Sequence, residues 1–187
     1  YLLIAVTDSQ GMVVAATEAS LVGRDDSRTA SFIAVRATRH PDIADVGVQV
    51  AESGVDTIAF TAPIFDQQGA FAGVVTSRVG VPFLEEVTTR TIRSLEAEQR
   101  AGVRVAYQML TRQGRVFADS DLSGKGAANL KELSFPSMLL SEAGVPGYIE
   151  EEHVRRHVQV VTGYAQTRGF RESAGLAWSV LLRMDRQ

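Results

Sequence analysis

Short apolar runs alternate with polar turns along most of this chain, and the pattern predicts a structure rich in β-strands. Apolar runs at 1–6 and 12–17 flank the sequence Asp8-Ser9-Gln10-Gly11, which is typical of a hairpin turn. The sequence Asp66-Gln67-Gln68-Gly69 predicts a second hairpin of the same kind. Further strands are expected at 46–52, 56–65, 70–79, 103–110, 115–120, 146–152, 157–165 and 176–184.

Three segments fit a helix instead of a strand. In 27–39 apolar residues lie among polar ones, and Pro41 ends the pattern. In 82–100 apolar residues recur at helical spacing, and Pro82 occupies a favourable first position. The stretch 133–144 is compatible with a short helix. The expected order is therefore hairpin, helix, strands and a long helix, after which the same order begins again.

The first hairpin has a second copy later in the chain. The matched pairs, all 103 residues apart, are Gln10-Gly11 with Gln113-Gly114, Val13 with Val116, and Ala15 with Ala118. Two looser matches set 21–24 against 122–125 and 60–69 against 162–169. We interpret the chain as two copies of one α+β unit, at 1–81 and 103–187, joined by a helix at 82–102.

Composition places the chain among globular proteins and excludes several kinds of function. The 187 residues are 45% hydrophobic and 22% charged, with a formal net charge of −3 and no long run of one sign. Nucleic-acid binding is therefore not predicted. The absence of cysteine excludes disulfides and thiolate metal sites. No apolar run approaches the ~20 residues that cross a bilayer. Because Tyr1 already lies in an apolar run, we expect a piece of a longer protein.

Motifs for catalysis are sparse. The turn at Gly11 is followed by a predicted strand, whereas a phosphate-binding loop leads into a helix. His153 and His157 are spaced so that both could face one metal, although the intervening residues lack the glutamate of a zinc protease motif. A solvated, charge-alternating strand is the alternative for this segment. No serine or cysteine nucleophile motif is present. The sequence predicts neither a cofactor nor an enzyme, and a metal-dependent enzyme at these histidines is the alternative.

Three stretches together resemble the Cache family of extracytoplasmic sensor domains. They are DSQGMVVAAT, LVGRDDSRTASFIA and TIAFTAPIFDQQGAFAGVV, in that order. The later stretches GYIEEEHVRRHVQVVTGYAQTRGF and LAWSVLLRMDRQ resemble the membrane-proximal half of a double Cache domain. The resemblance covers nearly the whole chain and implies two tandem PAS-like units, each a central antiparallel sheet with flanking helices.

The resemblance also implies a function and a location. Cache domains are the periplasmic sensing parts of bacterial membrane receptors, which feed a chemoreceptor, a histidine kinase or a cyclic-dinucleotide enzyme inside the cell. We therefore expect a membrane-anchored parent protein, a homodimer in the intact receptor, and a small molecule bound by the first, membrane-distal unit. The long helix with which the family usually opens is not in this sequence. A ligand-free dimerisation module is a further alternative.

The resemblance points to particular ligand-binding positions. In amino-acid-binding members an aromatic and arginine motif lies in the first-copy helix, and an aspartate on the last strand of that copy binds the ligand amine. Arg28 and Phe32 lie in the corresponding helix segment, with the arginine about one place out of register, and Arg78 stands at the place of the aspartate. A guanidinium group cannot bind an ammonium group, but its donors suit a carboxylate or a phosphate. We expect an organic anion or an uncharged metabolite rather than an ordinary amino acid.

Strand alternation adds two residues to this set. Thr76 shares a strand face with Arg78, and Phe60 lies on the neighbouring strand. A surface salt bridge is the alternative role for Arg78, and core packing is the alternative for Phe60. The expected ligand-binding residues are Arg28, Phe32, Phe60, Thr76 and Arg78.

Overall fold

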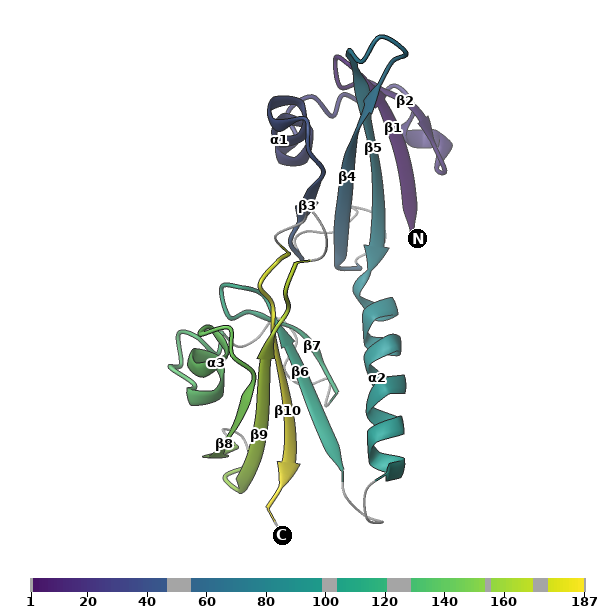
Figure 1. Cartoon of the computed structure of the whole chain (residues 1–187). Coiled ribbons are helices and arrows are strands. Elements are labelled where there is room, and N and C mark those ends of the chain that lie inside the picture. Colours follow the sequence, from purple (N-terminus) through teal and green to yellow (C-terminus); the bar gives the residue numbers. More distant parts are fainter. Residues whose placement is uncertain are drawn as a thin grey trace. The chain divides into compact units, whose positions relative to one another are not determined.

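The computed structural model describes residues 2–46, 55–98, 104–120, 129–153, 156–169 and 175–186. The chain divides into a first unit, Tyr1–Val81, and a second unit, Pro82–Gln187. Each unit contains a five-stranded antiparallel sheet (Figure 1). This arrangement confirms the predicted α+β class with two tandem PAS-like units.

The sheet of the first unit has the strand order β2-β1-β5-β4-β3. Helix α1 covers one face of this sheet, where Phe32 and Val35 pack against Val74. Thr29 caps the helix, because its Oγ1 accepts a hydrogen bond from the Phe32 N–H. The elements are β1 (Leu3–Asp8), β2 (Val13–Ala16), the 3₁₀ helix η1 (Ala19–Leu21), α1 (Ala30–Thr38), β3 (Asp42–Ala44), β4 (Thr57–Phe65) and β5 (Phe71–Gly80).

The sheet of the second unit has the equivalent order β7-β6-β10-β9-β8. Its core lies between the sheet and α3, where Leu110, Phe135, Met138 and Leu181 are buried together. The long helix α2 contacts the same sheet through Thr89, whose Oγ1 lies 3.5 Å from the Tyr107 hydroxyl. The elements are α2 (Val81–Glu98), β6 (Val105–Leu110), β7 (Val116–Asp119), α3 (Pro136–Ser141), β8 (Gly147–Glu152), β9 (Gln159–Gln166) and β10 (Ser179–Asp185).

The repeat detected in the sequence extends to irregular details of the backbone. A β-bulge interrupts the β1–β2 pairing between Val6 and Thr7, and the same bulge interrupts the β6–β7 pairing between Met109 and Leu110. These positions are again 103 residues apart. In each unit an isolated bridge follows the hairpin, Met12 with Asp25 and Arg115 with Asn129. The two units are therefore copies of one structural plan.

Steric constraints explain why a glycine closes the first hairpin turn of each unit. Gly11 and Gly114 have φ values of +94° and +86°, which L side chains rarely adopt. A Cβ on Gly11 would lie 2.5 Å from the Cα of Ser27, and one on Gly114 would lie 2.5 Å from the Cβ of Lys131. The repeated glycine thus lets a later segment of each unit cross close to the turn.

The third strand described in the first unit is one that the sequence pattern did not predict. A strand was expected at 46–52, but β3 occupies Asp42–Ala44 and Val46 lies in a bend. Residues 47–52 lie outside the described residues, and so does the predicted match of 21–24 with 122–125 in its second half. The short strand directly follows Pro41, which cannot donate a backbone hydrogen bond and commonly precedes a strand.

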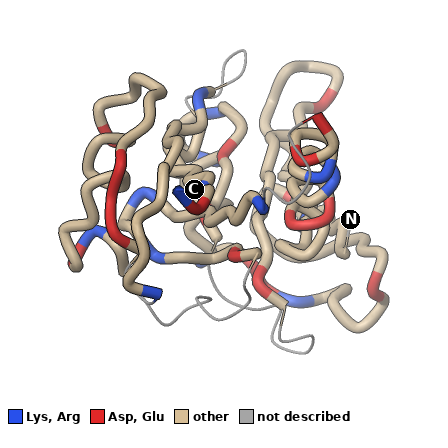
Figure 2. Tube along the Cα trace, turned by 90° about the horizontal axis from the view of Figure 1, so that it is seen from below, with Lys and Arg blue, Asp and Glu red and all other residues tan. Residues whose placement is uncertain are grey.

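Acidic and basic residues are interspersed along the described trace (Figure 2). This distribution agrees with the net charge of −3 and with the absence of a basic run in the sequence. Among the described residues, no helix combines the length and the apolar character that crossing a membrane requires.

Candidate ligand-binding site

The candidate site is the α1-facing side of the first sheet. Val74 packs under α1, so the alternating residues Thr76 and Arg78 on β5 point to the same side. Strand pairing brings Thr61 on β4 opposite Thr76, and their hydroxyl oxygens lie 3.1 Å apart. Asp42 on β3 lies opposite Thr61 in turn. The sheet therefore carries a polar row of Asp42, Thr61 and Thr76, with Arg78 two residues further along β5.

The neighbours of this row are small or apolar. Arg78 pairs with Leu3 on one side and with Ala59 on the other, and both of these residues are buried. Ala5 lies opposite Thr76. These apolar side chains offer no hydrogen-bond acceptor to the guanidinium group of Arg78.

Arg78 is half-buried and has no ion pair or hydrogen bond from its side chain within the described residues. The salt bridge that was the alternative role for Arg78 is therefore not found in this part of the chain. A guanidinium group can bind a carboxylate through two parallel hydrogen bonds, and the adjacent threonine hydroxyls can donate or accept further bonds. The arrangement can thus recognise a small anion by charge and by directed hydrogen bonds.

The structure does not bring Arg28 to this group. Arg28 is exposed and precedes α1. Hydrogen bonds from Ser27 are the main cause of the lowered pKa of Asp25, and the positive charge of Arg28 lowers this pKa to a smaller extent. Asp25 pairs with Met12, beside the turn that follows Asp8. Arg78 pairs with Leu3, at the other end of β1, which is about 16 Å away at the usual rise of a strand.

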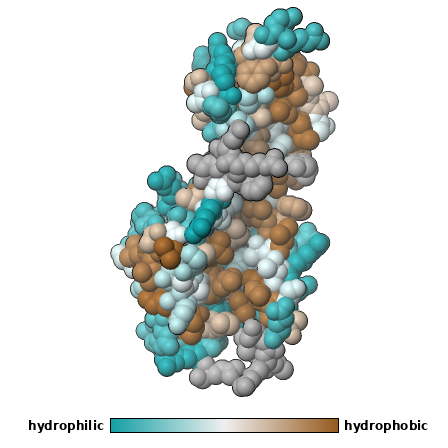
Figure 3. All heavy atoms as spheres, in the orientation of Figure 1, coloured by the Kyte–Doolittle hydropathy of each residue, from teal (hydrophilic) through white to brown (hydrophobic). Residues whose placement is uncertain are grey.

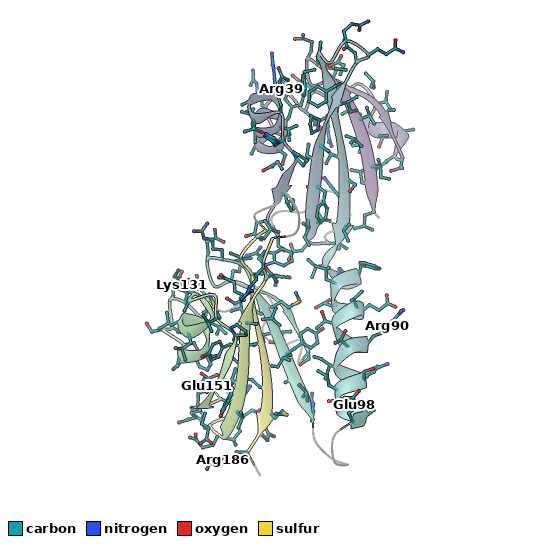
Figure 4. All side chains as sticks on the ribbon, in the orientation of Figure 1. Arg39, Arg90, Glu98, Lys131, Glu151 and Arg186 are labelled. Carbon is teal, nitrogen blue, oxygen red and sulfur yellow. The ribbon has the colours of Figure 1, made fainter. Side chains whose placement is uncertain are left out.

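Phe32 has a packing role in the first unit. Its side chain is only 2% exposed, and its ring meets Phe71 edge-on with 6.2 Å between ring centroids. The guanidinium of Arg39, at the end of α1, lies 4.3 Å from the centroid of the Phe71 ring (Figure 4). Phe32 therefore anchors α1 to the hairpin end of the sheet.

Phe60 lies on the opposite side of the sheet from Thr76 and Arg78. It pairs with Ser77, so it points away from α1, and its side chain is 42% exposed. Ile4 also pairs with Ser77 and is exposed on this side. Figure 3 shows apolar atoms at the surface over the strands of the first unit. The expectation that Phe60 joins the other site residues is corrected, because strand alternation alone does not say which face meets α1.

The two histidines considered for a metal are engaged with other groups. His153 and His157 lie in the connection between β8 and β9, and neither of the two residues is in a helix or a strand. The Nδ1 of His153 accepts a hydrogen bond from the Arg156 N–H at 3.3 Å, and the Nδ1 of His157 lies 2.7 Å from Glu152 Oε1. Among the described residues, no three His, Asp or Glu side chains are grouped to hold a metal ion.

A cavity of about 450 Å³ lies in the second unit between α2 and the strands β6 and β7. Ile92 and Tyr107 contribute to its buried floor. Its charged lining has both signs, with the carboxylates of Glu85, Glu96 and Asp119 and the guanidinium groups of Arg93 and Arg104. A charged ligand of either sign would therefore meet oppositely charged side chains in this cavity, but also side chains of its own sign that repel it.

Thr61 and Asp42 belong to the candidate site, but the sequence analysis did not predict them. Thr61 alternates with Ala59 and Pro63 on β4, and its hydroxyl lies opposite Thr76. This alternation in the sequence could have placed Thr61 in the candidate site. Asp42 directly follows Pro41, and it resembles a loop residue in the sequence. Only the pairing of β3 with β4 places its carboxylate in the row.

Comparisons with known proteins agree with this fold. Neither the family models nor the sequences of curated proteins give a match. Among solved structures, an extracellular ligand-binding receptor from Desulfohalobium retbaense DSM5692 is 18% identical with a TM-score of 0.70, and the match covers 97% of this chain and 30% of that one. The extracellular domain of a protein described as a histidine kinase, rpHK1S-Z16, is 16% identical with a TM-score of 0.66, covering 98% and 70%.

A third similar structure is a complex with a ligand. The ligand-binding domain of the Pseudomonas aeruginosa PAO1 amino acid chemoreceptor PctB, in complex with L-Gln, is 14% identical with a TM-score of 0.62, covering 100% of this chain and 69% of that one. The chain thus spans 30% of the first of these proteins and about 70% of the other two. Their fold agrees with the predicted resemblance to double Cache domains. The chain has the fold of the extracellular ligand-binding domains of chemoreceptors and histidine kinases.

Proposed function

We propose that this chain is the extracytoplasmic ligand-sensing domain of a bacterial signal-transduction receptor, and that it acts without catalysis. The shared fold with extracellular ligand-binding domains supports this function. The occupied Nδ1 atoms of His153 and His157 give no support to the alternative of a metal-dependent enzyme.

The ligand that the first unit suits best is a small organic anion. The observation that carries this choice is Arg78 beside the hydroxyl pair of Thr61 and Thr76, on the side of the sheet that faces α1. A carboxylate bound at Arg78 would receive two charge-assisted hydrogen bonds, and a hydroxyl could add another. Binding would stabilise whichever conformation of the first unit holds the ligand more tightly, which is the kind of population shift a sensor transmits.

Asp42 narrows the choice of anion. Its carboxylate lies at the far end of the polar row from Thr76, so a ligand with a second negative charge at that end would be repelled. A ligand with a hydroxyl or another donor at that end would be favoured instead. The PctB domain binds the amino acid L-Gln. The competing proposal for this chain is therefore an amino acid whose amine contacts Asp42.

In the intact receptor the sensing domain is anchored in the inner membrane and is part of a homodimer. The second unit then passes the ligand-dependent change to a cytoplasmic chemoreceptor, kinase or cyclic-dinucleotide output. These features rest on the resemblance to double Cache receptors. Apolar spans on both sides of this segment in the parent reading frame would test the anchoring.

A thermal-shift comparison tests the ligand class. The purified domain would be heated with acetate, lactate, succinate, L-alanine or L-glutamine at equal ionic strength. We expect a carboxylate without an amine to raise the Tm by about 2–5 °C. Arg78→Gln should abolish the shift, while Arg36→Gln, an exposed arginine of α1, should retain it.

Two outcomes would count against the proposal. Stabilisation by L-alanine or L-glutamine, but by no carboxylate that lacks an amine, would replace the organic anion by an amino acid. An unchanged Tm with every probe would favour a ligand-free module.

A further inference from the structure

We propose that the cavity between α2 and the strands β6 and β7 is a second ligand-binding site, and that it binds a dipeptide with free termini. This site is independent of the anion site proposed for the first unit. Its volume of about 450 Å³ lies in the range of about 300–1,000 Å³ that small-molecule sites occupy. In the second unit, α2 runs beside the sheet (Figure 1). The polar groups of the cavity follow one another in the order that such a ligand requires.

One face of α2 forms the first wall of the cavity. Glu85, Thr89 and Arg93 line the cavity and follow one another at intervals of four residues, so they share a face of the helix. Glu85 and Arg93 are about 12 Å apart along the helix axis at the usual rise of an α-helix. A carboxylate, a hydroxyl and a guanidinium group therefore lie in this order along the cavity.

The middle of the cavity combines an apolar floor with hydroxyl groups. Ile92 of α2 and Tyr107 of β6 are 6% and 5% exposed. The Tyr107 hydroxyl lies 3.5 Å from Thr89 Oγ1. Ser120 Oγ accepts a hydrogen bond from the Tyr107 N–H at 3.0 Å, and its own O–H can donate to a further acceptor. A polar group between two apolar segments of a ligand would find both donors and acceptors here.

The two ends of the cavity carry opposite charges that a ligand can use. Arg93 is exposed, and its guanidinium has no hydrogen bond or ion pair within the described residues. At the other end, the Oε1 atom of Glu85 is buried. A carboxylate accepts up to about four hydrogen bonds, so Glu85 can bind an ammonium group in addition to its present contacts. Arg93 suits a carboxylate, and Glu85 suits an ammonium group.

The other charged residues of the lining have structural partners. Glu96 Oε1 accepts the Val105 N–H at 2.8 Å, which ties the end of α2 to the start of β6. Asp119 Oδ2 accepts a hydrogen bond from Gln108 Nε2 at 2.9 Å. Arg104 also lines a small cavity together with Asp185. We therefore assign the charged ends of the ligand to Glu85 and Arg93.

The spacing of these groups selects a dipeptide. An extended dipeptide spans about 7 Å. A charge-assisted hydrogen bond of about 2.8 Å at each end brings the total close to the separation of Glu85 and Arg93 along the helix. The central amide of the dipeptide has one donor and one acceptor, which match the hydroxyls of Thr89 and Tyr107. A single amino acid is too short to bind both charged residues.

Dialanine and its two blocked forms test the proposal. The Tm would be measured in the Arg78→Gln domain, so that binding of a carboxylate in the first unit does not contribute. We expect L-alanyl-L-alanine to raise the Tm by about 2–5 °C. N-acetyl-L-alanyl-L-alanine lacks the ammonium group, and L-alanyl-L-alanine amide lacks the carboxylate, so neither should raise it. Equal shifts with the blocked forms, or no shift with dialanine, would overturn the proposal.

Matched substitutions on α2 identify the binding residues. Arg93→Gln and Glu85→Gln should each remove most of the shift that dialanine causes. Arg90→Gln and Glu98→Gln should retain it, because these exposed residues of α2 do not line the cavity (Figure 4). Arg90 pairs with Glu86 instead. An equal shift in all four variants would show that the dipeptide binds elsewhere.

An NMR measurement does not depend on the folding of these variants. The isoleucine methyl signals of the Arg78→Gln domain would be followed while dialanine is added. We expect the signal of Ile92 to move, because its side chain belongs to the buried floor. Ile33, which is exposed on α1 of the first unit, serves as the control. A shift of Ile33 without Ile92, or of neither signal, would contradict the proposed site.

Discussion

Arg183 and Glu151 form a buried ion pair in the second unit, with 3.7 Å between Nε and Oε1 and side-chain exposures of 6% and 4%. Arg183 lies on β10 and Glu151 on β8, and these two strands are not neighbours, because β9 lies between them. Glu151 Oε2 also accepts the Ser137 N–H at 3.1 Å, which ties the start of α3 to the sheet. The Arg183 guanidinium lies 5.2 Å from the ring centroid of Phe135. The pair therefore links α3 to the sheet through charge as well as packing.

Breaking this pair from one side should be costly. Glu151→Gln leaves the buried charge of Arg183 without its counterion, so we expect the free energy of unfolding to fall by about 3–5 kcal/mol. Urea denaturation followed by circular dichroism would measure the loss. The double change to Met at both positions should restore much of the stability. Arg186→Gln breaks an exposed pair and should cost less than about 1 kcal/mol, and equal costs for the buried and exposed pairs would contradict the prediction.

The carboxyl group of Asp185 should report on Arg156. Hydrogen bonds from Arg156 lower the pKa of Asp185 below its ordinary value of 3.8. Arg156→Gln removes these bonds, so the pKa should rise toward 3.8. An NMR titration of the Asp185 carboxyl carbon would measure the change. The same titration of Arg186→Gln should match the wild type.

The lowered pKa of Asp185 determines how its contribution to stability changes with pH. Since the pKa of Asp185 is lower in the folded state, its stabilising contribution is present above the unfolded pKa. It is lost as the pH falls through the folded pKa. The wild type should therefore lose a small part of its stability relative to Arg156→Gln only in the acid range, below about pH 4. A difference that grows instead between pH 5 and 8 would contradict this assignment.

The two glycine turns of the first unit should respond differently to substitution. Gly11 and Gly69 both have positive φ, at +94° and +81°. A Cβ on Gly69 meets nothing within 4 Å, so Gly69→Ala should cost about 1–2 kcal/mol for backbone strain alone. Gly11→Ala should cost clearly more, because the new Cβ would lie 2.5 Å from the Ser27 backbone. Chemical denaturation of both variants would decide, and equal losses would show that the turn yields freely.

Phe32 and its neighbour Ile33 provide a matched test of how α1 is held. Phe32 is buried beside Phe71, whereas Ile33 is 54% exposed. Phe32→Ala should lower the free energy of unfolding by about 3–5 kcal/mol. Ile33→Ala should change it by less than about 1 kcal/mol. Similar losses at the two positions, measured by thermal unfolding, would mean that Phe32 does not anchor the helix.

Several features of the fold could be predicted from short stretches of the sequence. The turn at Gly11 needed a polar residue and a glycine, and Asp8 indeed accepts hydrogen bonds from the Gln10 and Met12 N–H groups. The turn at Gly69 repeats this with Asp66, which accepts from Gln68 and Ala70. Such bonds join residues close in sequence, so the sequence carries their signal. The strand at Asp42–Ala44 could not be predicted, because a three-residue strand is too short for its alternation of polar and apolar residues to be recognised.

The sequence by itself determined the hairpin turns, the long helix and the position of Arg78 on its strand, because each depends on residues within a few places of one another. It also determined the repeated units, because the same local turn pattern occurs twice. Tertiary structure alone decided which face of the first sheet meets α1. That choice turned Phe60 away and placed Thr61 and Asp42 in line with Thr76. In the second unit, tertiary structure likewise decided that Glu151 is buried against Arg183. These relationships depend on strand register between distant segments, and burial of the whole apolar face selects that register.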